Sequence, residues 1–171
     1  VLSNNDGCVV SRSQEVKDLG VKMAVPWFQL KDLAKRHGII ALSSNYTLYA
    51  DLSNRVMRLL SQYSPDQEIY SIDEEFLSLS GFASQNLTEY GRQIRTTVKQ
   101  WTGLPVSVGI AETKTLAKIA NRVAKRTPDT GGVFDLLACS DRDALLGRVT
   151  VEDVWGIGPN HARLLNQRGI T

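Results

Sequence analysis

Apolar positions along the chain repeat with two different periods, which separates predicted helices from predicted strands. Spacings of three and four residues are typical of amphipathic helices, and they predict helices over residues 45–63, 86–101, 113–126 and 160–167. Alternating and β-branched runs are typical of strands, and they predict two strands within 68–80 joined near 73–75, one strand at 106–110 and one at 133–136. Prolines and glycines separate these elements.

The first 44 residues predict shorter elements. Val1–Ser3 and Val9–Ser11 flank Asn4–Gly7, whose Asp-Gly pair is typical of a tight hairpin turn. The elements that follow are a helix over 12–19, a helix that begins with Pro26 and ends at His37, and a brief strand at 39–42. Strands that interleave with helices and include a hairpin favour an α+β fold around one split-βαβ sheet.

The composition excludes several classes of protein. The chain has 171 residues, of which 42% are apolar and 22% charged, enough for one core or for one core and a small appendage. It contains neither the roughly 18 consecutive apolar residues of a membrane helix nor a signal segment at its start. Cys8 and Cys139 lie too far apart to indicate a disulfide framework, and with His37 and His161 they form no zinc motif. These observations favour a soluble, cytosolic protein.

The net charge of +2 conceals a strong segregation along the chain. Residues 51–90 contain two Lys or Arg and seven Asp or Glu, whereas residues 91–126 contain eight Lys or Arg and one Glu. Segregated charge can be no more than a property of the solvated surface. An acidic segment that is followed by a strongly basic one within one small protein is the alternative to be explained by function.

Asp73 and Glu74 are the first candidate site residues. Neighbours in a regular strand point to opposite faces, so adjacent carboxylates converge only where the backbone bends, as at the predicted hairpin. Converging carboxylates repel each other, and a hard divalent cation such as Mg²⁺ removes that repulsion by binding oxygen atoms from both. An acidic turn is also typical of a solvated hairpin tip. The apolar neighbours favour a fixed turn; they are Ile69, Tyr70, Ile72, Phe76 and Leu77.

Lys114 and Lys118 are the second candidates. They lie on or near one face of the helix predicted over 113–126, together with Arg122 and Lys125. A lysine in the first turn opposes the helix dipole unless an anion binds there, and the free N–H groups of that turn complete a phosphate cradle. A solvated basic face is the alternative, and Glu112 in the first turn would satisfy part of the dipole without any ligand.

Two further patterns indicate weaker candidates. Gly156 and Gly158 bracket one apolar residue, which permits a tight turn with exposed N–H groups, as in helix–hairpin–helix modules that hold a DNA phosphate. A plain helix–helix turn is the alternative. Ser11, Gln14 and Lys17 share one face of the first predicted helix, which is otherwise an ordinary exposed face.

Several segments resemble motifs of Y-family translesion DNA polymerases. Residues 70–74, Tyr-Ser-Ile-Asp-Glu, resemble the second carboxylate motif of that family. Residues 108–118 resemble the strand and helix that follow it, and residues 154–158 resemble the start of the thumb. Residues 3–7 and 43–51 are similar to the UmuC-type branch, the catalytic subunit of bacterial DNA polymerase V. The motifs occur in the family order over nearly the whole chain.

The resemblance implies a right-hand layout and assigns roles to the candidates. It implies fingers at 1–44, a palm with a ferredoxin-like split-βαβ sheet at 45–126, and the start of a helical thumb with a helix–hairpin–helix at 127–171. Asp73 and Glu74 would be catalytic ligands of a two-metal Mg²⁺ site. The nucleotide-binding residues would be Ser11, Gln14, Lys17 and Lys114, and the DNA-binding residues Lys118, Gly156 and Gly158. Many members have Tyr and Arg where this chain has Gln14 and Lys17.

The implied activity is template-directed nucleotidyl transfer past DNA lesions, in DNA repair and the SOS response. Its partners would be primer–template DNA, deoxynucleoside triphosphates, a UmuD-type subunit, a sliding clamp and a recombinase filament, with no membrane. The chain begins without Met and stops soon after Gly169, so we expect a part of a longer protein. In the family, the first metal-binding Asp and the aromatic residue that excludes ribonucleotides would precede Val1. We therefore expect the 171-residue chain to be inactive by itself.

Two other functions agree with the same residues. A palm-type nucleotide cyclase also joins a carboxylate pair to a phosphate-binding lysine, although the fingers segment and the Gly156–Gly158 turn argue against it. A non-catalytic DNA-binding or partner-binding module could keep the palm as a scaffold only.

Overall fold

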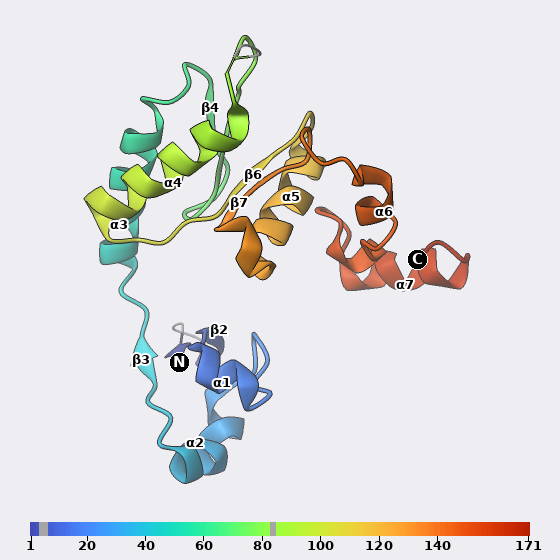
Figure 1. The fold of residues 1–171 in the computed structure, drawn as a ribbon. Coiled ribbons are helices and arrows are strands. Elements are labelled where there is room, and N and C mark those ends of the chain that lie inside the picture. The colour runs from blue at the N-terminus through green and yellow to red at the C-terminus, as the bar shows by residue number, and fades with distance from the viewer. Residues whose placement is uncertain (4–6, 83–84) are drawn as a thin grey trace. The chain divides into compact units, whose positions relative to one another are not determined.

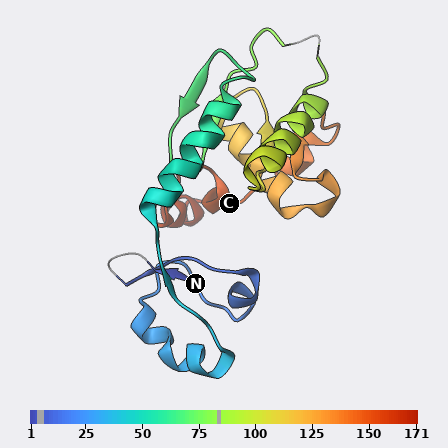
Figure 2. The same ribbon diagram turned by 90° about the vertical axis from the view of Figure 1, so that its left-hand side faces the viewer.

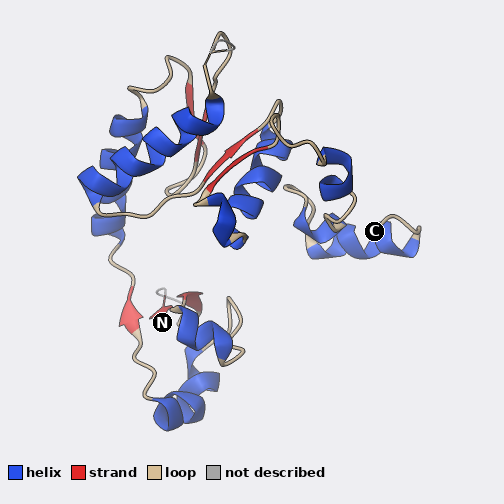
Figure 3. Ribbon diagram, in the orientation of Figure 1, coloured by secondary structure: helices blue, strands red, loops and turns tan. Residues whose placement is uncertain are grey.

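The computed structural model describes residues 1–3, 7–82 and 85–171. The chain folds into two compact units, Val1–Asp51 and Leu52–Thr171 (Figure 1). Among the predicted features, the hairpin turn Asn4–Gly7 falls outside the described residues except for Gly7. Helices and loops make up most of the described chain, and the strands are short (Figure 3).

The first unit is built on a small three-stranded sheet. β1 (Leu2–Ser3) pairs antiparallel with β2 (Val9–Ser11), as predicted, and parallel with β3 (Leu42–Ser43). The helical elements are α1 (Gln14–Asp18), the 3-10 turn η1 (Trp27–Leu30) and α2 (Lys31–His37). A buried cluster of Val9, Val16, Val21 and Leu30 holds them together.

Three expectations for this unit need correction. The helix predicted over 12–19 is shorter, because Ser13 occupies its N-cap and Ser11 is the last residue of β2. Pro26 does not begin a helix; its extended ψ of 130° places it just before η1. The strand predicted at 39–42 pairs only at its end, as Leu42–Ser43.

The second unit starts within a long helix and continues into a hairpin. α3 (Tyr46–Leu60) is followed by β4 (Gln67–Ile69) and β5 (Glu75–Leu77), which pair antiparallel as predicted. α4 (Leu87–Thr102) packs beside α3, as the two views show (Figures 1 and 2), and the buried contacts between them are Val56, Leu59, Ile94 and Val98. Asn86 caps α4 by accepting the backbone N–H of Glu89 at 3.1 Å, which confirms the predicted helix start.

A parallel strand pair lies between two helices in the second unit. β6 (Val108–Ile110) pairs with β7 (Val133–Asp135), with α4 on one face and α5 (Lys114–Arg126) on the other. Gly109 faces α5 so closely that a Cβ there would lie 2.1 Å from the backbone nitrogen of Asn121. Only a residue without a side chain permits this approach, so Gly109 fixes α5 against the strand.

The described strands do not form the single sheet that the sequence predicted. β4–β5 and β6–β7 are separate two-stranded ladders, and no strand among the described residues pairs with both. The short C-terminal elements are η2 (Pro128–Thr130), α6 (Arg142–Leu146), η3 (Val151–Asp153) and α7 (Pro159–Gln167). Within the described ranges we find no helix with the length and apolar character needed to span a bilayer.

Candidate active site

The β4–β5 hairpin turn presents the two predicted carboxylates. Asp73 lies in the bend and is exposed, and Glu74 lies directly before β5 and is partly buried. The Ser71 N–H donates to the carbonyl of Glu74 at 3.3 Å, which closes the turn. The Ser71 hydroxyl donates to Asp73 Oδ1 at 2.8 Å and orients that carboxylate. The hairpin therefore supplies the bend that adjacent carboxylates need in order to converge.

Glu74 is held by two residues from different elements. Lys118 of α5 donates to Glu74 Oε1 at 2.5 Å and to the Tyr70 hydroxyl at 2.8 Å. The Tyr70 hydroxyl donates in turn to Glu74 Oε2. The Lys118 side chain is only 23% exposed, so this ion pair is screened less than an ordinary surface pair.

These contacts shift the protonation of all three groups. Burial opposes ionisation of Glu74, but its hydrogen bonds from Lys118 and Tyr70 outweigh burial and lower its pKa below the ordinary value. For Lys118, burial acts to lower the pKa, but the contacts with Glu74 and Tyr70 outweigh burial and raise the pKa. Burial and the bond to Glu74 raise the pKa of the Tyr70 phenol. Glu74 is thus ionised and Lys118 is protonated at neutral pH.

Lys114 reaches the same hairpin from the first turn of α5. It forms an ion pair with Glu68 of β4, and its ammonium lies 5.6 Å from the centroid of the Phe76 ring. Thr113 caps the helix by accepting the N–H of Leu116 at 3.3 Å. Glu112 lies outside the first turn, contrary to expectation, because Thr113 is the N-cap and α5 begins at Lys114; its carboxylate instead binds Arg142 at 2.5 Å. Lys114 and Lys118 therefore both contact the β4–β5 hairpin, and Lys118 does so at Glu74.

The two-residue alternation of side chains along the hairpin strands explains which residues face the two lysines. Residues 68, 70, 74 and 76 provide all the hairpin contacts to the two lysines. Glu75 and Leu77 alternate with them, and Leu77 packs against the α3–α4 core. Glu68 was not predicted from the sequence as a partner of Lys114, although the alternation of side chains between the two faces of residues 68–76 could have indicated it.

Glu75 is a carboxyl group on the core side of the hairpin. Gln67 donates its amide to Glu75 and also to the carbonyl of Met57 in α3, at 2.8 Å. The other oxygen, Glu75 Oε1, is buried and has no hydrogen-bond partner among the described residues. Burial raises the pKa of Glu75 to about 7, against the smaller opposing effect of Gln67. This group was not identified from the sequence as distinct from its two acidic neighbours.

The glycine turn lies in the same unit as the carboxylates. Gly156 adopts a φ of +92°, and Gly158 is the N-cap of α7, with Pro159 in its first turn. Trp155, directly before this turn, contacts the rings of Tyr70 and Phe76, with centroids 5.6 Å away in both cases. An ion pair between Arg122 of α5 and Asp153 also fastens this segment.

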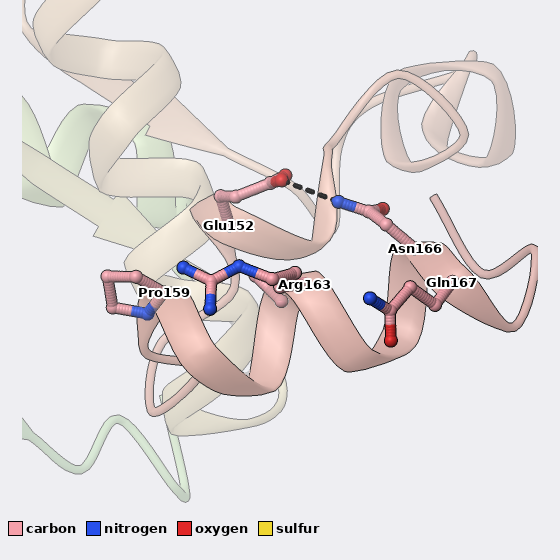
Figure 4. Close-up of a pocket in the computed structure, with 6 residues that line it drawn as sticks. Glu152, Pro159, Arg163, Asn166 and Gln167 are labelled. Carbon is pink, nitrogen blue, oxygen red and sulfur yellow. Dashed lines mark hydrogen bonds between the residues drawn. The ribbon is translucent and has the colours of Figure 1, made fainter.

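A shallow depression of about 560 Å³ lies between η3 and α7. Figure 4 shows its floor, where Asn166 donates to Glu152 at 2.7 Å beside the Arg163 side chain. None of its lining residues is one of the predicted site residues; they are Glu152, Pro159, Ala162, Arg163, Asn166 and Gln167. The chemistry of the hairpin is therefore separate from this depression.

Three predicted residues belong to the first unit. Ser11, Gln14 and Lys17 are all exposed, and Gln14 donates to Asp18 at 2.8 Å. Ser11 lies on a strand and the other two lie on α1, so they do not share one helical face as predicted. The hairpin belongs to the second unit.

Asp73 and Glu74 have donor atoms suited to a divalent cation. Mg²⁺ in proteins usually takes one or two carboxylates and completes its shell with water and substrate phosphate oxygens. Across residues 1–3, 7–82 and 85–171, no group of three or more His, Cys, Asp or Glu side chains could hold a metal ion. Asp73 and Glu74 could supply the one or two carboxylates of a Mg²⁺ shell.

Comparisons with known proteins agree over nearly the whole chain. A profile of the impB/mucB/samB family matches residues 1–122. Protein UmuC of Salmonella typhimurium is 51% identical over 172 residues, which cover 99% of this chain and 41% of that protein. Among solved structures, DinB from Sulfolobus solfataricus gives a TM-score of 0.80 at 29% identity, covering 100% of this chain and 50% of that one. An insertion ternary complex of Dbh DNA polymerase gives 0.79 at 28% identity, covering 99% and 51%.

The matches confirm an α+β fold of the polymerase type in outline. They also show that the chain spans about two fifths of the length of the curated relatives that it matches.

Proposed function

Since the chain belongs to the impB/mucB/samB family, we propose that it is the fingers, palm and first thumb segment of a translesion DNA polymerase of the UmuC type. The observation that carries this proposal is the contact between an acidic hairpin turn and a basic helix. Glu74 lies beside Lys118, and Lys114 extends from the first turn of the same helix. Phosphoryl transfer depends on positioning and charge neutralisation, which these groups supply.

Asp73 and Glu74 would hold Mg²⁺ ions, which stabilise the charge of the attacking and leaving oxygens during phosphoryl transfer. Ser71 orients Asp73, and Tyr70 orients Glu74, so neither carboxylate has to be organised when the nucleotide binds. Lys118 keeps Glu74 ionised.

Lys114 would bind the triphosphate of the incoming nucleotide. Its present partner, Glu68, is roughly half exposed, so an anion with several charges can displace that carboxylate. Ser11, Gln14 and Lys17 of the fingers are also proposed as nucleotide-binding residues.

Gly156 and Gly158 would hold the DNA backbone through the N–H groups of a helix–hairpin–helix turn, and Lys118 would add positive charge toward the DNA. The division into fingers at 1–44, palm at 45–126 and thumb at 127–171 belongs to this proposal. We also propose the bacterial cytoplasm as its location. Its proposed partners are a UmuD-type subunit, a sliding clamp and a recombinase filament.

Two observations argue against the alternative functions, a nucleotide cyclase and a non-catalytic palm. The relatives include proteins named as DNA polymerases rather than cyclases. Against a purely structural palm, the chain combines a carboxylate pair at the hairpin turn with a basic helix that contacts it, and Glu74 is ionised.

Primer extension by the full-length protein tests the function. We expect Asp73→Ala and Glu74→Ala each to lower the rate of nucleotide addition on the order of 100-fold or more. Glu89→Ala, which removes an exposed carboxylate on α4, is the matched control and should retain the wild-type rate. Activity that survives either hairpin substitution would exclude the two-metal mechanism. Primer extension by the unmodified 171-residue chain would contradict our expectation that this chain is inactive by itself.

A further inference from the structure

Three aromatic rings connect the carboxylate hairpin to the segment before the glycine turn. Tyr70 and Phe76 stack with their ring centroids 5.4 Å apart and an interplanar angle of 24°. The Trp155 indole meets both rings at 5.6 Å, with angles of 66° to Tyr70 and 56° to Phe76. We call Tyr70, Phe76 and Trp155 the aromatic cluster.

Both candidate phosphate-binding lysines lie over rings of this cluster. The Lys118 ammonium is 5.3 Å from the centroid of Tyr70, and the Lys114 ammonium is 5.6 Å from that of Phe76. Cations are attracted to the faces of aromatic rings, so the orientation of each ring helps to set the position of its lysine. Tyr70 also binds Lys118 through its hydroxyl.

Trp155 is the member of the cluster that comes from another part of the chain. It is 41% exposed, so burying the indole in a core is not its main role. Its edge contact with Tyr70 and its tilted contact with Phe76 limit how far these two rings can turn. Its backbone continues directly into Gly156, while the ion pair Arg122–Asp153 holds the preceding turn to α5.

We infer that Trp155 is a positioning residue for nucleotide binding, which holds the Tyr70 and Phe76 rings and thereby places Lys118 and Lys114 for the triphosphate. This inference rests on the proposed function, because it assumes that the two lysines face a nucleotide. The main effect is expected on nucleotide affinity, because the rings that Trp155 contacts lie beside both lysines, while Lys118 still binds Glu74 directly.

Steady-state primer extension by the full-length protein separates the possibilities. We expect Trp155→Ala to raise the KM for the nucleotide about fivefold and to change kcat less than twofold. Trp155→Phe keeps an aromatic ring and should restore the KM to within about twofold of wild type. Trp101→Ala is the control, because Trp101 is 68% exposed at the end of α4 and should leave both constants unchanged.

Trp155 fluorescence provides a readout that does not depend on turnover. Within these 171 residues, Trp27→Phe and Trp101→Phe leave Trp155 as the single tryptophan. Titration with dATP should change the part of the emission that a further Trp155→Phe replacement removes. Adding Lys114→Ala should raise the half-saturating dATP concentration about fivefold or more. An emission that does not respond to saturating dATP would overturn the inference.

The two hypotheses fail in different ways. A wild-type protein that extends no primer overturns the proposed function, and this inference with it. An active Trp155→Ala variant with the wild-type KM overturns this inference alone. So does a Trp155→Ala variant that loses only kcat or thermal stability, because such a loss indicates a structural role.

Discussion

Replacing Glu75 by Gln should change how the stability of the chain depends on pH. Glu75 is a half-buried carboxyl with one oxygen bonded to Gln67 and the other without a partner among the described residues. Its pKa rises from 4.5 to about 7 because burial penalises the charged form. The folded chain therefore binds a proton at Glu75 more tightly than the unfolded chain does, and folding is favoured most below pH 4.5. That contribution is lost as the pH rises through about 7.

The magnitude follows from the size of the pKa change. The full difference corresponds to an upper bound of roughly 3 kcal/mol in the free energy of unfolding. Because the side chain is only half-buried, solvent screens the penalty, and we expect roughly 1–2 kcal/mol. Gln has the shape of Glu but no charge, so the variant lacks this pH-dependent contribution.

Urea unfolding at pH 4.5, 5.5, 6.5 and 7.5, in EDTA, measures the effect. Relative to Glu75→Gln, the wild type should lose roughly 1–2 kcal/mol of unfolding free energy over this range. Other groups, such as Glu74, titrate in both proteins and cancel in the difference. Glu89→Gln controls for the same replacement at an exposed site. A difference between wild type and Glu75→Gln that does not vary with pH would refute the reasoning.

Three further predictions concern single contacts. Lys114→Ala should raise the KM for the nucleotide about tenfold, with a smaller change in the Kd for primer–template DNA; the opposite order would contradict its role. Gly109→Ala should lower the free energy of unfolding by roughly 3 kcal/mol in urea titrations, because the new Cβ would collide with the backbone of α5; a loss below about 1 kcal/mol would contradict that contact. Asn86→Ala should cost about 1 kcal/mol by loss of the α4 cap, and Asn86→Asp should recover most of it; equal stability of both variants would argue against capping.

Local signals in the sequence predicted the elements of the site well. The cap at Asn86, the hairpin around Asp73 and the helix that carries Lys114 all depend on residues within a few positions of one another. Such interactions are visible in spacing alone. The α+β class followed from the order of these elements.

Non-local contacts could not be predicted in this way. The spacing of three and four residues in α4 would place Trp101 on the same stripe as the buried Ile94 and Val98, but Trp101 is 68% exposed. Spacing identifies a face of a helix without showing how far its partner extends along it. The pairing of strands has the same difficulty, so the expected single sheet proved to be two ladders. Glu112 meets Arg142 across 30 residues, which no helix-start signal reveals.

The two faces of the β4–β5 hairpin make the chain unequally tolerant of different kinds of mutation. Residues 68, 70, 74 and 76 meet the lysines and Trp155, while Glu75 and Leu77 on the alternate positions belong to the interior. A substitution disturbs one of these sets at one position. A single-residue insertion or deletion within 71–74 would shift the register by one and exchange the faces of a whole strand. Variation in length at this turn should therefore be far rarer than variation in residue type.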